Sequence, residues 1–340
     1  MIHLGTEATV SVIIPNYNRV ELIGETLNTI LNQTRPPEEV IVVDDGSTDD
    51  SVALIRTFAP RIRLITQMNA GPAAARNRGF AEARGRYIQF FDSDDLCALN
   101  KIEVQLAALE STGADVAYSP WLQAEIRDGL VLYRELPLQQ GPLPARHPPE
   151  FYFVRSWVTV FQPCLFRRAV LEKAGPFRED LKPSEDSELL FRILLSGAKL
   201  VHVPDTLVLY RLHRSNQISG SALGSRARST DWLNYTKYIM KAIEDNPGRF
   251  SPLDRLVWLA EVAFARRQLN QFDCPGTDRD KEFLRSRLTS DVLATFRILR
   301  RGIERRLSGS GFHACYQPRP LGVWQINLLR EIGYEPQRAC

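Results

Sequence analysis

Acidic residues occur together at a point where the chain could carry out chemistry. The run Asp-Ser-Asp-Asp at 92–95 directly follows an apolar segment, 87–91, that has the composition of a strand. Carboxylates in this arrangement can hold a hard divalent cation such as Mg²⁺ or Mn²⁺ and leave positions for phosphate oxygens. Such an ion would neutralise the charge on a nucleoside diphosphate as it leaves a sugar. The alternative is that these acids only cap the following helix.

A second acidic pair, Glu185 and Asp186, stands where a helical pattern begins. A carboxylate in this place could take the proton from an attacking hydroxyl as a general base. The helix dipole favours the ionised carboxylate, which is the form that a base needs. Capping of the helix is the alternative role. His213 could be a neutral imidazole ligand of a metal, although a single histidine is more often structural.

Short apolar runs and helical patterns alternate through the first third of the chain. The apolar runs lie at 10–14, 40–43, 61–66 and 87–91, with helical spacing between them. This β-α-β-α-β-α-β order predicts an α/β fold with a mostly parallel sheet and helices on both faces. Ligands of such sheets bind at the carboxyl ends of the strands. Polar residues follow these strand ends, namely Asn16, Tyr17, Asp44, Asp45, Asn69 and the run at 92–95.

Composition and missing motifs exclude several other classes of protein. The chain has 340 residues, 44% of them hydrophobic, and a net charge of +3, which suits a globular protein of about two domains and does not favour nucleic acid. The five cysteines have no metal or redox spacing, and no signal peptide or bilayer-length run is present, so we expect a cytoplasmic protein. No glycine-rich dinucleotide motif and no P-loop occur.

Four segments together resemble the signatures of family 2 glycosyltransferases of the GT-A fold. They read Val-Ile-Ile-Pro-Asn-Tyr-Asn at 12–18, Val-Val-Asp-Asp-Gly-Ser-Thr-Asp at 42–49, Asn-Ala-Gly-Pro-Ala-Ala-Ala-Arg-Asn at 69–77 and Phe-Asp-Ser-Asp-Asp at 91–95. They occur in the family's order and spacing, and the resemblance covers residues 8–215. It implies transfer of a sugar from a nucleotide diphosphate sugar, a UDP-sugar in the first instance, to an acceptor hydroxyl with inversion.

The resemblance also implies which residues bind the donor. Pro15, Tyr17 and Asp45 match the positions that hold the nucleotide base, with Asp45 accepting a hydrogen bond from a uracil-type edge. Asn69 and Arg76 match donor-side contacts, and Asp92 matches the ribose contact. The full donor-binding set implied in this way is Pro15, Asn16, Tyr17, Asp45, Asn69, Arg76, Asp92 and Ser93.

Three further residues match the metal and base positions of the family. Asp94 matches the principal ligand of a Mg²⁺ or Mn²⁺ ion, and His213 matches the family's C-terminal metal histidine. Asp186 matches the catalytic base, which would deprotonate the acceptor hydroxyl in one inverting displacement with an oxocarbenium-like transition state. The chain departs from the family at 162–164, where Gln-Pro-Cys replaces the usual small or glycine-containing loop. The Q-x-x-R-W motif of processive synthases is absent, which favours addition of one sugar per encounter.

We expect two parts, a GT-A-like catalytic domain at 1–218 and a mainly helical C-terminal region at 219–340. The catalytic domain divides into a nucleotide-sugar-binding part at 8–115 and an acceptor part at 116–218. In the C-terminal region, apolar residues recur at helical spacing over 292–307 beside several arginines. This pattern predicts a basic amphipathic helix, which either contacts an anionic membrane surface at the inner face or packs on protein.

The expected acceptor is a hydroxyl of a sugar or of a lipid-linked or protein-linked glycan, as in surface polysaccharide, glycolipid or glycoprotein synthesis. Two rival functions remain. A sugar-nucleotide nucleotidyltransferase should have a glycine-rich loop after the first strand, where residues 15–18 are Pro-Asn-Tyr-Asn instead. A non-catalytic nucleotide-sugar-binding scaffold would not need intact Asp92, Asp94 and Asp186, and donor hydrolysis would distinguish it.

Overall fold

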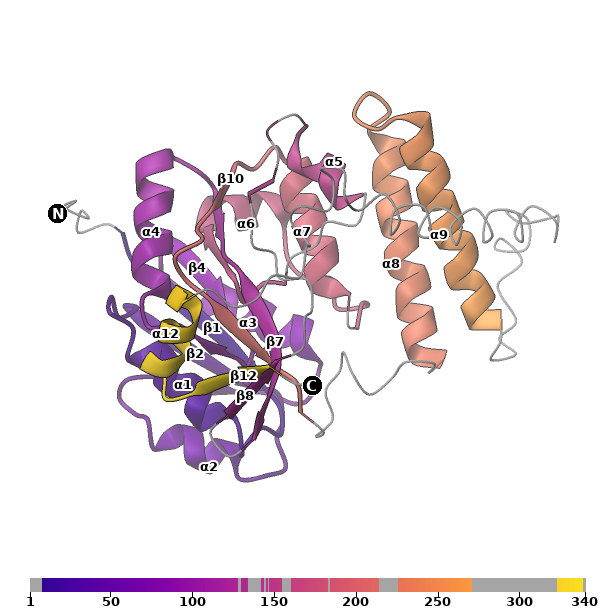
Figure 1. Ribbon diagram of the computed structural model, residues 1–340. Helices are drawn as coiled ribbons and strands as arrows, with labels where there is room; N and C mark the ends of the chain where they lie inside the picture. Colours follow the sequence, from indigo (N-terminus) through magenta and orange to yellow (C-terminus); the bar gives the residue numbers. More distant parts are fainter. Residues whose placement is uncertain are drawn as a thin grey trace.

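The computed structural model describes residues 8–127, 130–133, 142–143, 145, 147–154, 160–182, 184–213, 226–270 and 323–338. Its largest element is a seven-stranded sheet (Figure 1). Across the sheet the strands are β10 (Leu200–His202), β6 (Val116–Tyr118), β9 (Cys164–Arg167), β4 (Tyr87–Phe90), β1 (Val10–Asn16), β2 (Glu39–Asp44) and β3 (Arg63–Thr66). Strand β9 is antiparallel to β4 and β6, and the other neighbours are parallel.

The predicted mostly parallel α/β sheet is therefore confirmed. The apolar runs at 10–14, 40–43, 61–66 and 87–91 correspond to β1, β2, β3 and β4. Strand β1 lies in the middle of this set, paired in parallel with β2 on one side and β4 on the other. The register places Asn16 beside Asp44 at the carboxyl edge. This edge is where ligands of parallel sheets bind.

Helices cover both faces of the sheet because successive strand side chains point to opposite faces. Ile13 and Val43 belong to one core, and Val12 and Val42 belong to the other. The first core is covered by α3 (Pro72–Glu82), α5 (Pro149–Phe153), α6 (Arg168–Ala174) and α7 (Glu185–Leu195). The second is covered by α1 (Ile23–Leu31), α2 (Ser51–Arg56) and α4 (Lys101–Thr112).

A second sheet of five strands extends the carboxyl edge of the first. In order across the sheet they are β12 (Glu335–Arg338), β8 (Leu130–Tyr133), β7 (Trp121–Arg127), β11 (Val208–Arg211) and β5 (Leu96–Cys97). Strand β5 begins directly after Asp95, and β11 ends two residues before His213. This sheet therefore brings the acidic run and His213 to the same place.

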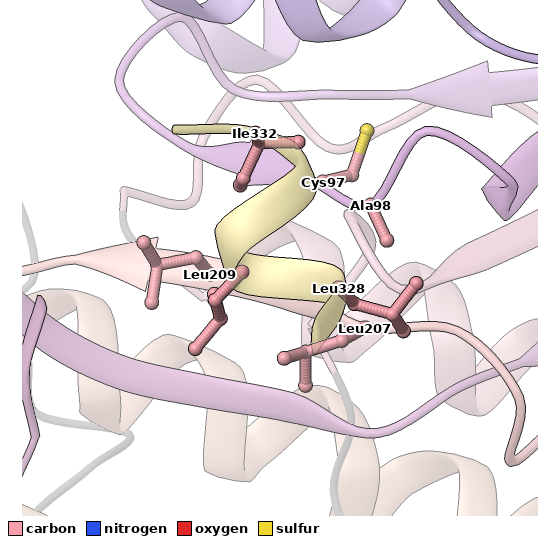
Figure 2. A pocket seen from close by; sticks show the side chains of 7 residues that line it. Cys97, Ala98, Leu207, Leu209, Leu328 and Ile332 are labelled. Atoms are coloured by element: carbon pink, nitrogen blue, oxygen red, sulfur yellow. The ribbon is translucent and has the colours of Figure 1, made fainter. Parts of the chain in front are cut away.

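Helix α12 (Val323–Glu331) covers one face of the second sheet. Figure 2 shows its Leu328, with Ile332 just beyond its end, facing Cys97, Leu207 and Leu209. The contact is apolar and leaves no space that would admit a water molecule. The C-terminal segment thus packs on the strands that flank the acidic run.

The remaining helices, α8 (Arg226–Asp245) and α9 (Pro252–Asn270), form an antiparallel pair beside α7 (Figure 1). Their buried apolar residues share the first core with α7, and the Trp258 indole donates a hydrogen bond to the Val154 carbonyl at 3.1 Å. The predicted amphipathic helix at 292–307 and the boundary at 218/219 lie outside the described residues. In the described ranges, no helix has the length and apolarity that crossing a membrane requires.

Close approach of α3 to the sheet depends on Gly79. A Cβ at this position would overlap the Cγ2 methyl of Ile13 and lie 3.3 Å from the Cγ2 of Val43. We therefore expect Gly79→Ala to lower the free energy of unfolding by about 1–3 kcal/mol, measured by urea denaturation. The matched control is Gly248→Ala, since nothing lies within 4 Å of its Cβ position. Equal losses in both variants would contradict the proposed packing role.

Candidate functional site

The ends of β1 and β2 are joined by a buried polar network around Asp44. Its carboxylate accepts hydrogen bonds from the Asn16 amide at 2.9 Å and from the Ser47 backbone and hydroxyl at 2.9 and 2.6 Å. These bonds fix the Asn16 side chain, whose buried Oδ1 has no hydrogen-bond partner among the described residues. Asn16, one of the predicted donor-binding residues, therefore presents a free acceptor at this edge.

Asp45 holds the loop that follows β3. Its carboxylate accepts hydrogen bonds from the Gln67 amide at 2.8 Å and from the backbone N–H groups of Ala70 and Gly71 at 2.9 and 2.8 Å. A carboxylate offers about four acceptor positions, so about one remains for a ligand. The same loop contains Asn69, so Asp45 orders the segment that carries a second predicted donor-binding residue.

The other predicted base-binding residues lie at the end of β1. Pro15 is buried within the strand, and Tyr17 follows it with 44% of its surface exposed. An exposed aromatic ring of this kind can stack on the face of a nucleobase. The structure thus leaves the Tyr17 ring open for the role that the family resemblance implies.

The predicted metal ligands Asp94 and His213 are brought together, although 119 positions separate them in the chain. His213 Nε2 and Arg19 Nε each lie 3.0 Å from Asp94 Oδ2. Burial alone would raise the pKa of Asp94, but the hydrogen bond with His213 and the positive charge of Arg19 outweigh it and lower the pKa. Asp94 is therefore ionised, as a metal ligand must be.

A cluster of three carboxylates surrounds this position. Ligand atoms of Asp92, Asp94 and Asp95 lie within 4.8 Å of one another. Oxygen ligands with one imidazole suit Mg²⁺ or Mn²⁺. One oxygen of Asp95, Oδ2, is buried without a hydrogen-bond partner in the described part of the chain. The residues present therefore fit the metal that the sequence predicts.

Three residues that the sequence analysis missed hold this acidic run. The Arg211 backbone N–H donates to Asp95 Oδ1 at 2.9 Å, and its guanidinium donates to the Asp94 carbonyl. The Thr26 hydroxyl lies 3.0 and 2.9 Å from the carbonyls of Ser93 and Asp95. Arg19, the third, contacts Asp94 directly. One signal for Arg211 was available, because it ends an apolar strand two residues before His213.

Arg76 connects this cluster to the acidic pair at the start of α7. Its Nη1 lies 2.7 Å from Glu185 Oε1, and its Nη2 lies 2.7 Å from Asp92 Oδ1. Arg76 as a whole is 7% exposed. Gln162, from the segment that departs from the family pattern, also donates a hydrogen bond to Asp92. Arg76, predicted as a donor contact, thus links the predicted ribose contact to the helix that carries Asp186.

Burial governs the charge of Asp186. Desolvation and the nearby charge of Glu185 raise the pKa of Asp186 to about 7, against the opposing charge of Arg76. The dipole of α7 favours the ionised carboxylate, as predicted from the sequence, but burial outweighs that effect on the pKa of Asp186. A pKa close to neutral suits a general base, since it combines an available carboxylate with useful basicity.

Comparisons with known proteins identify the family of this chain. Residues 11–175 match the family model described as glycosyl transferase family 2. The glycosyltransferase GlyG of Streptococcus pneumoniae serotype 4 is 30% identical in an alignment of 222 residues that covers 62% of this chain and 72% of that protein. The succinoglycan biosynthesis protein ExoO of Rhizobium meliloti is 31% identical over 61% of this chain and 62% of that protein.

Other relatives are much longer than this chain. An uncharacterized glycosyltransferase of Rickettsia bellii is 47% identical over 106 residues, and the match spans 31% of this chain and 15% of that protein. Its counterparts in Rickettsia felis and Rickettsia conorii are matched over 18% of their lengths.

Solved structures show the same fold at low sequence identity. The crystal structure of S. aureus TarS 1-349 in complex with UDP has a TM-score of 0.58 and 20% identity, covering 96% of this chain and 90% of that one. The mannosyltransferase PcManGT from Pyrobaculum calidifontis, in complex with GDP-Man and Mn²⁺, has a TM-score of 0.52 and 22% identity, covering 85% and 79%. The chain belongs to glycosyl transferase family 2.

Proposed function

We propose that the protein transfers a sugar from a nucleoside diphosphate sugar to an acceptor hydroxyl, with inversion, in a metal-dependent reaction. The observation that carries the proposal is the convergence of Asp94 and His213 with the α7 acids across Arg76. TarS binds UDP and PcManGT binds GDP-Man with Mn²⁺, which supports a nucleotide-sugar donor for this chain. We favour a UDP-sugar, because the carboxylate of Asp45 can accept a hydrogen bond from the N–H on the edge of a uracil.

Each residue has one task in the proposed mechanism. Tyr17 stacks on the base, and Asp45 accepts a hydrogen bond from its edge. Asp94 and His213 would hold Mn²⁺ or Mg²⁺, which when bound supplies positive charge beside the departing diphosphate. Asp186 takes the hydroxyl proton of the acceptor. The new glycosidic C–O bond forms as the bond between sugar and diphosphate breaks, and Asp186 ends protonated.

The reaction should lose activity in acid because Asp186 must be ionised. Since the pKa of Asp186 is about 7, kcat/KM should fall about tenfold for each pH unit below that value. Glu185→Gln removes a neighbouring negative charge, so the pKa of Asp186 should fall and the acid limb should move to lower pH. The measurement is kcat/KM against pH at saturating Mn²⁺.

The control for this pH profile is Glu188→Gln on the same helix. Glu188 is paired with Arg192 at 2.8 Å, and the largest shifts in the pKa of Asp186 come from burial, Glu185 and Arg76 instead. Its removal should leave the acid limb unchanged. An acid limb that stays in place in Glu185→Gln would contradict the assignment of this titration to Asp186.

The donor class is tested by thermal shift with a panel of nucleotide sugars in Mn²⁺. A donor at a hundred times its dissociation constant should stabilise the fold by about 2.7 kcal/mol. We expect the largest shift with a UDP-sugar and little shift in chelator. No shift with any nucleotide sugar would contradict the proposed donor class.

For the acceptor we propose a hydroxyl of a growing surface glycan. The support is the similarity to ExoO, which is named for succinoglycan biosynthesis. An acceptor screen should therefore give transfer to oligosaccharides before peptides. Transfer to a peptide alone would direct the proposal to glycoprotein synthesis instead. We further propose the division into a catalytic domain at 1–218 and a mainly helical region at 219–340.

A further inference from the structure

The turn that leads into α7 is attached to helix α8 through Asp231. Its carboxylate accepts a hydrogen bond from the Ser184 hydroxyl at 2.7 Å and a second from the Lys182 backbone N–H. Asp231 is 6% exposed, so solvent competes little for either bond. Ser184 immediately precedes Glu185 and Asp186. One side chain of α8 therefore forms hydrogen bonds with two residues, Lys182 and Ser184, that precede the proposed base Asp186.

The Ser184 side chain does not cap the helix that it precedes. A serine at the start of a helix normally accepts a hydrogen bond from a backbone N–H of the first turn. The Ser184 side chain makes no such bond in α7 and donates to Asp231 instead. The start of α7 is thus fixed by a contact with a distant helix rather than by its own cap.

The same turn lies against the donor side of the site. A Cβ at Gly71 would lie 2.7 Å from the Cε of Lys182, so the lysine stem packs directly on this glycine. The Gly71 N–H donates to Asp45, a predicted base-binding residue. The turn at 181–182 and Ser184 therefore lie between the donor loop and α8.

One turn beyond Asp231, helix α8 carries a second residue, Tyr235, which interacts with the proposed general base Asp186. Tyr235 is buried, and burial together with the charges of Asp186, Glu188 and Glu261 raises its pKa. The hydroxyl is therefore neutral beside Asp186 throughout the physiological range. Asp231 and Tyr235 place one face of α8 along the first turn of α7.

We infer that Asp231 is a positioning residue that sets the location of Asp186 through Ser184 and Lys182. Asp231 does not touch the reacting groups in this arrangement, and its effect is transmitted by the turn. A base displaced by about 1 Å loses about 10²-fold in rate, so a modest shift of the turn is sufficient. This inference rests on the proposed role of Asp186 as the base.

Asp231→Ala tests the inference directly. Turnover should fall about 10- to 100-fold, while calorimetry shows nucleoside diphosphate affinity within twofold of the wild type. Asp231→Asn should restore turnover to within about threefold, because its amide can accept from the Lys182 N–H and donate to the Ser184 hydroxyl. Ser184→Ala should lose part of the activity, and the double variant Ser184→Ala/Asp231→Ala should be no worse than Asp231→Ala.

Ile243→Ala is the matched control, since Ile243 is a fully buried residue of α8 far along the helix from Asp231. It should lower the melting temperature and leave turnover per folded molecule unchanged. Unchanged turnover in both Asp231→Ala and Ser184→Ala would overturn the inference, as would equal losses in Asp231→Ala and Asp231→Asn. If Asp186→Asn remains active, the proposed base itself is wrong, which is a separate failure.

Discussion

Asp186→Asn is expected to lower turnover about 10²- to 10⁴-fold while donor affinity stays near the wild-type value. Asparagine has the same shape but cannot take the proton of the acceptor hydroxyl. The loss corresponds to about 3–5.5 kcal/mol of activation free energy. The measurement is steady-state transfer, with calorimetry of donor binding in parallel.

The neighbouring acids serve as controls for Asp186. Arg76 pairs with Glu185, and Arg192 pairs with Glu188, whereas no arginine pairs with Asp186 in the ranges that the structure describes. Glu188→Gln should therefore affect stability more than turnover. If Asp186→Asn transfers sugar within a few-fold of the wild type, the base lies elsewhere, and Glu185 and Glu188 become the next candidates.

Asp94→Asn should weaken nucleoside diphosphate binding in Mn²⁺ by about 10- to 100-fold or more. Mutation of a residue that only orients a metal ligand already lowers metal affinity by about that factor. In chelator the affinity should change by less than about twofold, since the metal then contributes nothing. The asparagine oxygen can still accept the bonds from Arg19 and His213, so the fold should persist. Calorimetry in Mn²⁺ and in EDTA measures both affinities.

The matched control for Asp94 is Asp49→Asn. Asp49 accepts hydrogen bonds from the backbone of Val20 and Ser51, and it does not belong to the carboxylate cluster. This variant should bind nucleotide with an unchanged dependence on Mn²⁺. An equal loss in Mn²⁺ and in EDTA for Asp94→Asn would contradict the assignment of Asp94 as a metal ligand.

The sequence predicted the central sheet because local patterns determine it. Apolar runs of strand length alternate with helical spacing, and parallel strands place their carboxyl ends at one edge. The second sheet was not predicted, because β5 has two residues and β12 pairs with a strand about two hundred positions earlier. Pairing over such distances leaves little local signal.

The candidate site could be predicted from the sequence only in part, for the same reason. The motifs identified Asp94 and His213, and in the fold Asp94 Oδ2 lies 3.0 Å from His213 Nε2. The bridge from Arg76 to Glu185 spans 109 positions, and no local pattern reveals it. The pKa of Asp186 depends on burial, so the helix-dipole argument had the wrong sign for the net shift. The donor-binding, metal and base roles remain predictions until the variants above are measured.

The central claim is a single inverting displacement at a nucleotide sugar, and proton NMR of donor turnover tests it most directly. The purified protein is incubated with the best-binding nucleotide sugar and Mn²⁺, with water as a slow acceptor. We predict a nucleoside diphosphate and a free sugar whose first-formed anomer is opposite to that of the donor. Asp186→Asn and EDTA should each abolish this turnover. A nucleoside monophosphate with a sugar phosphate, retention of the anomeric configuration, or an intact donor despite tight binding would contradict the account.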